Sequence, residues 1–283
     1  MAHTKIISAL SVVLAAGSAH AASFEVRDAV ARVVVIPEAR KDVKVEMLKT
    51  NGSLPLTVRT EGDRVVIDGK LSHRITLCRS IGENVRVHVL GVGEVGYADM
   101  PQVVVRTPKA VVGEAGGAVF GVVGKSDSVD LGNSGCGDWM LADTAGRVRL
   151  RQAGSGDTKM GASRELDVRV AGSGDVAAGP VAGPVTVSVS GSGDVRAASA
   201  NGPIDIKIAG SGDVLIAGGH ASDASVSVAG SGDINLNLVA ESLRARVAGS
   251  GDVRVKQVTG SVSKSTAGSG SIIIGNAKNG DGE

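Results

Sequence analysis

The second half of the chain alternates between apolar and polar residues over short stretches. Leu166–Val170, Val185–Val189, Ile204–Ile208 and Ala224–Val228 place β-branched or aliphatic residues at every second position. This period of two is typical of a strand with one buried face, and no helical period accompanies it. The pattern therefore predicts an all-β fold in which each short strand needs neighbours to cover its apolar side.

A glycine turn follows each of these strands at nearly constant spacing. Gly-Ser-Gly-Asp begins at Gly154, Gly172, Gly191, Gly210, Gly230 and Gly249, with variants at Gly135 (Gly-Cys-Gly-Asp) and Gly268 (Gly-Ser-Gly-Ser). From Gly135 onward the successive spacings are 19, 18, 19, 19, 20, 19 and 19 residues. Such a repeat indicates stacked coils, each too small to bury its apolar face alone. We predict a right-handed parallel β-helix (β-solenoid) with coils of about 19 residues.

Running the alternation through the turn gives each position a direction. With Val170 inward, Gly172, Gly174 and Val176 also point inward, whereas Ser173 and Asp175 point outward. The interior should then contain one stacked column made of Val170, Val189, Ile208, Val228 and Val247. We expect glycine at both inward turn positions because a side chain would fill the tight corner or forbid a positive φ.

The same parity stacks the turn aspartates in one outward column, which we call the Asp ladder: Asp138, Asp157, Asp175, Asp194, Asp213, Asp233 and Asp252. Carboxylates about 5 Å apart repel by about 0.8 kcal/mol in water. Turn N–H groups that donate to the carboxylates could offset this repulsion, and so could a divalent cation between rungs. Cations that lie six residues before an Asp could also reduce the repulsion between carboxylates: Arg151, Arg169, Lys207 and Arg246. We favour a ladder without metal or cofactor.

The repeat is weaker in the rest of the chain, and this difference divides the chain into the predicted regions. Residues 22–110 hold short strand-like runs separated by turns such as Asn51-Gly52, and form either irregular coils or an antiparallel cap. Residues 111–275 form the regular solenoid, and 276–283 a flexible polar tail.

The first 21 residues read as a secretory signal peptide. Lys5 precedes an apolar stretch, Ile6 to Ala16, which at eleven residues is shorter than the ~20 that a membrane span needs. Ala19-His20-Ala21 then predicts cleavage between Ala21 and Ala22. We expect an exported mature chain without a membrane span.

Export bears on the two cysteines. An oxidising compartment permits a disulfide between Cys78 and Cys136. Cys136 replaces the turn serine, so its side chain should point outward, and the bond would join the irregular N-terminal part to the first regular coil. The alternative, two free thiols, stays open at this point.

Taken together, the Gly-Ser-Gly-Asp units and their flanking Val/Ile alternation resemble those of the bacterial GIN-domain proteins, described as auto-transporter adhesin heads. The resemblance is strong over residues about 110–275 and rests on pattern alone over 24–110. It implies a β-helix, an envelope location and an adhesin-like role, and it carries no catalytic residues. Since an auto-transporter also needs a C-terminal outer-membrane barrel, which this sequence does not suggest, we expect periplasmic residence, with the cell surface as the alternative.

Composition narrows the classes of function. After cleavage the basic and acidic residues balance, 29 against 29, so nothing favours nucleic acid as a partner. We expect a non-enzymatic structural or adhesin-like module that presents a flat solenoid surface to an envelope protein or polysaccharide. The alternatives are a calcium-stabilised solenoid and a polysaccharide-active enzyme, for which the acids outside the repeat, Glu94, Asp99 and Glu114 near Tyr97, are the candidates.

Overall fold

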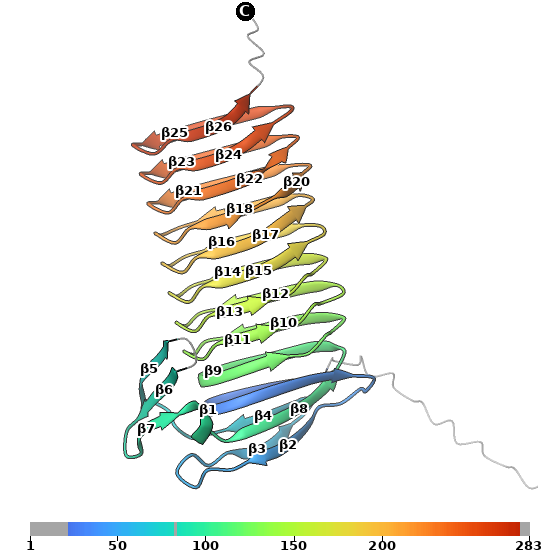
Figure 1. Ribbon diagram of the computed structural model, residues 1–283, viewed down its shortest axis with the longest axis vertical. Helices are drawn as coiled ribbons and strands as arrows, with labels where there is room; N and C mark the ends of the chain where they lie inside the picture. The colour runs from blue at the N-terminus through green and yellow to red at the C-terminus, as the bar shows by residue number, and fades with distance from the viewer. Residues whose placement is uncertain (1–21, 82–83, 278–283) are drawn as a thin grey trace, which may run out of the picture.

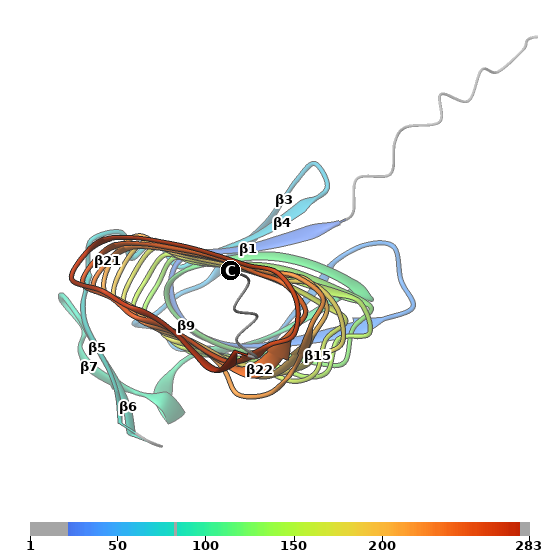
Figure 2. The same cartoon turned by 90° about the horizontal axis from the view of Figure 1, so that it is seen from above.

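The protein is a stack of flattened coils closed at one end by an irregular region (Figure 1). The computed structural model describes residues 22–81 and 84–277. The predicted signal peptide with Ala21, and residues 278–283 of the predicted tail, lie outside the described residues. Viewed along the stack, the coils form a narrow ring with two long sides (Figure 2). The predicted parallel β-solenoid is confirmed.

Each long side is a parallel sheet. Strands before the turns form the first side: β10 (Ser128–Asn133), β12 (Arg147–Gln152), β14 (Glu165–Val170), β16 (Val185–Val189), β18 (Ile204–Ile208), β21 (Ala224–Gly230), β23 (Leu243–Gly249) and β25 (Val262–Gly268). The long β9 (Ala110–Val123) contributes to both sides, because its first half pairs with β10 and its second half pairs with the first strand of the second side. Strands after the turns form the second side: β11 (Trp139–Leu141), β13 (Thr158–Met160), β15 (Val176–Val181), β17 (Val195–Asn201), β19 (Val214–Ile216), β22 (Ile234–Ala240), β24 (Val253–Val258) and β26 (Ile272–Ala277), with the short β20 (Gly219–Ala221) beside β17 and β22.

The strand register reproduces the spacing of the turns. Arg147 pairs with Glu165, 18 positions on, and Ile204 pairs with Ala224, 20 positions on. The predicted interior column is present, because Val170, Val189, Ile208, Val228 and Val247 follow one another as register partners and are each at most 2% exposed. Aliphatic columns of this kind form one continuous core. Hydrophobic burial between coils is therefore the main stabilising term.

The N-terminal region contains both structures that the sequence left open. β1 (Ser23–Glu38) pairs in parallel with β9 on one edge, and with β4 (Arg64–Asp68) and β8 (Gln102–Pro108) on the other, so these strands continue the solenoid. β2 (Lys44–Lys49) and β3 (Thr57–Glu61) then add antiparallel to β8 and β4. β2 and β3 are therefore the outermost, antiparallel strands at this end of the stack.

A separate antiparallel sheet, the flap, lies outside the ring (Figures 1 and 2). It consists of β5 (Ile75–Ile81), β6 (Asn84–Val89) and β7 (Gly93–Gly96), and the 3-10 helix η1 (Tyr97–Asp99) follows it. Val87 and Val89 of the flap pack with Ala118 and Phe120 of β9 in a second, smaller core. A disulfide between Cys78 of β5 and Cys136 of the first regular turn, with Cα atoms 6.1 Å apart, ties the flap to the solenoid.

No helix in the described part of the chain is long and apolar enough to cross a membrane. At the C-terminal end, β26 extends to Ala277, one residue past the predicted start of the tail at Asn276.

Candidate functional site

Backbone contact between coils explains both glycines of the turn. A Cβ on Gly172 would lie 2.1 Å from the carbonyl oxygen of Gly154, and one on Gly174 would lie 2.1 Å from that of Gly156. The predicted need for a positive φ applies to fewer positions, such as Gly230 at +146° and Gly249 at +140°. Close stacking of one turn on the next is thus the common reason for glycine, and the turn is structural.

The Asp ladder joins consecutive turns through hydrogen bonds. The backbone N–H of each aspartate from Asp157 to Asp252 donates to Oδ1 of the aspartate one coil earlier, at 2.8–2.9 Å. Ser271 continues the series by donating from its N–H and its hydroxyl to Asp252. The donors are turn N–H groups, as the sequence predicts, and each belongs to the coil that follows the accepting aspartate. Charge-assisted bonds of about 1.5–3 kcal/mol each are large enough to offset the repulsion between rungs.

At the C-terminal end of the Asp ladder, the hydrogen bonds lower the pKa of a carboxyl group. The Ser271 hydroxyl and N–H, followed by the charge of Arg254, lower the pKa of the Asp252 carboxyl. Because the charged form is the one that accepts these bonds, this carboxylate keeps its interactions at pH values where a free aspartic acid would already protonate. The stability that it contributes is lost only as the pH falls through this lowered pKa.

The cations expected to support the ladder lie elsewhere, which corrects that prediction. Arg151 pairs with Glu114 and Asp130, and Lys207 pairs with Asp205, so both serve the first long side. The turn reverses the chain, and a residue six positions before an Asp therefore lies on the opposite strand. Ladder carboxylates are contacted by residues two positions after an Asp: Arg196 reaches Asp194 at 2.8 Å, and Arg254 reaches Asp252 at 2.6 Å.

The ladder bonds predict a small effect for Asp194→Asn. An Asn carbonyl can accept the Asp213 N–H, and the change removes repulsion from Asp175 and Asp213, while the exposed Arg196 pair that it breaks is worth at most about 1 kcal/mol. We expect the melting temperature to change little, with the same result in calcium and in chelator. Asp194→Ala, which removes the acceptor, should cost more. A melting temperature that rises strongly with calcium, and a rise that Asp194→Asn weakens, would contradict the metal-free ladder.

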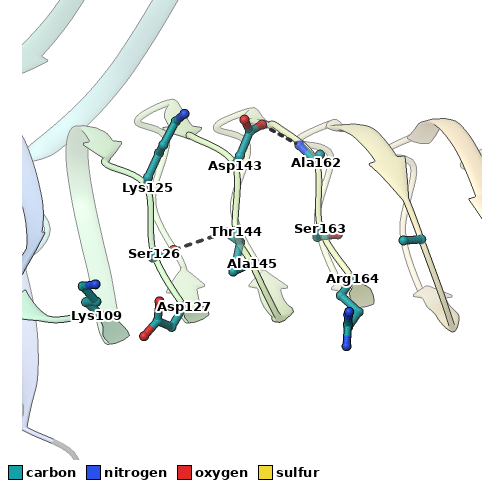
Figure 3. Close-up of a pocket in the computed structure, with 11 residues that line it drawn as sticks. Lys109, Lys125, Ser126, Asp127, Asp143, Thr144, Ala145, Ala162, Ser163 and Arg164 are labelled. Atoms are coloured by element: carbon teal, nitrogen blue, oxygen red, sulfur yellow. Dashed lines mark hydrogen bonds between the residues drawn. The ribbon is translucent and has the colours of Figure 1, made fainter.

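A shallow hollow lies at the other corner of the coils, where connectors link one coil to the next. We call it the connector groove; it has a volume of about 520 Å³ and runs along the stack (Figure 3). Three successive connectors, at residues 125–127, 143–145 and 162–164, cross it side by side. Their middle residues, Ser126, Thr144 and Ser163, are each at most 6% exposed and form its floor.

Charged side chains form the rims of the connector groove. Lys125 and Asp143 lie on one rim, and Lys109, Asp127 and Arg164 lie on the other (Figure 3). The Asp143 carboxylate is oriented by the N–H of Ala162, which donates to Oδ1 at 2.9 Å. Among the described residues no carboxylate lies within ion-pair distance of Lys109, Lys125 or Arg164. These three cations are exposed and available to a ligand.

The floor supplies hydroxyl groups. Ser126 Oγ and Thr144 Oγ1 lie 3.3 Å apart and share a hydrogen bond, whereas the buried Ser163 Oγ has no partner within the described part of the chain. The groove is lined by hydroxyl, cationic and carboxylate side chains and by neither His nor Cys. The arrangement suits recognition by hydrogen bonds and charge.

The acids proposed for an enzyme are not part of this groove. Glu94 lies on the flap and pairs with Arg86, Asp99 lies in η1, and Glu114 lies on β9 and pairs with Arg151. The described residues likewise contain no group of three or more His, Cys, Asp or Glu side chains arranged to hold a metal ion.

Comparison with known proteins gives one family. The sequence matches the family described as "Putative auto-transporter adhesin, head GIN domain" over residues 41–219 and 183–277. Among curated proteins none matches significantly. A solved structure entitled "Putative lipid binding protein", from Parabacteroides distasonis, is 19% identical with a TM-score of 0.50, and covers 90% of this chain and 92% of its own. Another, entitled "a putative cell adhesion protein", from Clostridium sporogenes, is 10% identical with a TM-score of 0.23 over 90% and 92%. The structure from Parabacteroides distasonis supports the β-solenoid fold.

Proposed function

Because the chain belongs to the GIN-domain family of auto-transporter adhesin heads, we propose that it is a non-enzymatic, exported module that binds an envelope polysaccharide in the connector groove. The observation that carries the proposal is the groove itself, which runs across consecutive coils with a hydroxyl floor between two charged rims. A linear polymer can lie along such a groove and meet the same backbone geometry at each coil.

The chemistry of the groove fits an acidic sugar polymer. Its volume, about 520 Å³, falls within the 300–1,000 Å³ typical of ligand sites. The lining residues include no aromatic side chain on which a sugar ring could stack, so binding would rest on charge and hydrogen bonds. Lys109, Lys125 and Arg164 can bind carboxylate or phosphate substituents, while Asp127 and Asp143 can accept hydrogen bonds from sugar hydroxyls.

Rigidity supports a binding role. The groove residues lie on connectors held on both sides by parallel coils, so little conformational entropy is lost when a ligand binds. The disulfide supports export, since such bonds persist in oxidising compartments. We propose the periplasm as the location and keep the cell surface as the alternative.

Affinity electrophoresis of the purified protein tests this function. Gels containing alginate, an acidic polysaccharide, should retard the protein more than gels containing dextran, a neutral one, relative to a gel without polymer. Lys125→Gln combined with Arg164→Gln should weaken the retardation about tenfold or more, because each lost charge-assisted contact is worth about 1.5–3 kcal/mol.

The matched control removes the same charges elsewhere. Arg244→Gln combined with Lys256→Gln acts on exposed residues of β23 and β24 and should leave the retardation unchanged. Equal loss in both variants would indicate nonspecific charge attraction. Absence of retardation in both polymers would argue against a polysaccharide and leave a protein partner as the better candidate.

A further inference from the structure

The two ends of the solenoid are treated differently. At the N-terminal end, β2 and β3 pair antiparallel with β8 and β4 and are the outermost strands. At the other end, β25 pairs only with β23 and β26 only with β24 within the described residues. All seven residues of β25 are exposed, and this coil lies at the top of the stack in Figure 1. The outer edge of the last coil therefore presents unpaired backbone donors and acceptors beside partly open core positions.

The last coil also breaks the pattern of the core. One inward column, followed from coil to coil by strand register, contains six consecutive aliphatic residues: Leu150, Val168, Val187, Ile206, Val226 and Ala245. The next residue in this column is Lys264. Thr266 likewise continues the column that runs through Val228 and Val247. At the flanking outward positions, where β23 has Arg244 and Arg246, β25 has Ser263 and Ser265.

A charge at an inward position has a specific physical effect. Lys264 is exposed, because no further coil covers it among residues 22–81 and 84–277. Any β-strand that joined this edge would cover its ammonium group, and burying an unpaired charge is strongly unfavourable. An inward-pointing charged residue is one of the ways in which natural sheets prevent pairing at an open edge.

We propose that Lys264 keeps the open end of the solenoid from pairing with the same end of a second copy of this chain. The second copy is the relevant partner because the concentration of identical open edges rises with the protein itself. The N-terminal end presents the antiparallel strands β2 and β3 instead of a coil of matching geometry, so the edge that matches β25 is a second β25, and the competing assembly is a two-fold dimer in which the two strands pair antiparallel. Val262, 42% exposed, and the partly buried Ile272 and Ile274 would supply apolar contact in that dimer.

Lys264→Val tests the proposal, because it continues the aliphatic column to the edge. Sedimentation velocity over a range of protein concentration should show a monomer for the wild-type chain and a concentration-dependent dimer for the variant. Circular dichroism and the melting temperature at low concentration should stay unchanged, since Lys264 packs against no further coil. Lys264→Thr, which matches the neighbouring Thr266, is a second variant that should also associate, though more weakly.

Lys256→Val is the matched control. Lys256 is an exposed, outward residue of the preceding coil, so the variant adds the same apolar side chain away from the edge and should remain monomeric. A wild-type dimer, or monomeric Lys264→Val and Lys264→Thr variants, would overturn the proposal. Equal association of the Lys256 and Lys264 variants would overturn it as well, because added surface hydrophobicity would then explain the result.

Discussion

Replacing Gly212 with alanine is expected to lower the free energy of unfolding by about 3 kcal/mol or more, the upper range for overpacked sites. The new Cβ would lie 2.2 Å from the carbonyl oxygen of Gly193 in the preceding coil. The Gly193 oxygen cannot move away from the new Cβ, because the parallel sheets on either side hold both turns in place. Gly212 has no left-handed φ, so the cost comes from the contact between coils and not from the backbone torsion.

Thermal or denaturant unfolding of the variant measures this effect, and Gly218→Ala is its matched control. The Cβ of that control would meet nothing closer than the carbonyl oxygen of Ala198 at 3.8 Å. Since alanine restricts the unfolded chain, the control should be neutral or more stable by about 0.4–1 kcal/mol. Similar destabilisation at both positions would show that coil-to-coil contact is not the reason for the turn glycines.

The regular coils could be predicted from sequence because two local signals agree there. Period-two alternation sets which side chains point inward, and the spacing of the turns sets the register, so Val170 and Val189 could be placed in one column without any long-range information. The same parity placed Asp175 and Asp194 in one outward column. It did not reveal that Asp194 N–H donates to Asp175 Oδ1, because parity gives the direction of a side chain and says nothing about which backbone donor from the next coil reaches it.

The N-terminal region could not be predicted in the same way because its pairings have no constant offset. β1 pairs with β9, β4 and β8 across very different sequence separations, and no repeated residue marks these contacts. Buried polar residues in the first regular coils were also missed. Asn133 and Gln152 occupy the inward column later filled by Val170, and Asn133 Nδ2 donates to the Gly137 carbonyl at 2.9 Å.

The connector groove left a trace in the sequence that pattern reasoning did not use. Ser126, Thr144 and Ser163 recur at 18 and 19 residues, the period of the coils, as small hydroxyl residues at equivalent connector positions. Val181 and Ala200 replace them in the next two coils. The column thus changes from polar to apolar along the stack, and the groove occupies its polar part. A search for period-matched polar residues outside the turn would have indicated this corner.

Loss of the disulfide is the second large effect that we expect. Cys78 and Cys136 enclose a sequence separation of 58 residues, and in the chain-entropy account opening such a loop lowers the free energy of unfolding by about 4 kcal/mol. The flap depends on this bond more than the coils do, because its other anchor is the small core around Val87, Val89 and Phe120. We therefore expect Cys78→Ala combined with Cys136→Ala to destabilise the whole chain and to loosen β5–β7 first.

Two measurements separate these consequences. Denaturant unfolding of the double variant should show the lower stability, and reductant should bring the wild-type chain to the same midpoint while leaving the variant unchanged. Hydrogen exchange should then show faster exchange for the amides of β6, whereas those of β16 and β18, deep in the regular stack, should follow only the global change. If the double variant unfolds at the wild-type midpoint, the bond adds no stability beyond the packing of Val87 and Val89 against β9. If β6 and β18 lose protection equally, the bond stabilises the whole chain and does not hold the flap in particular.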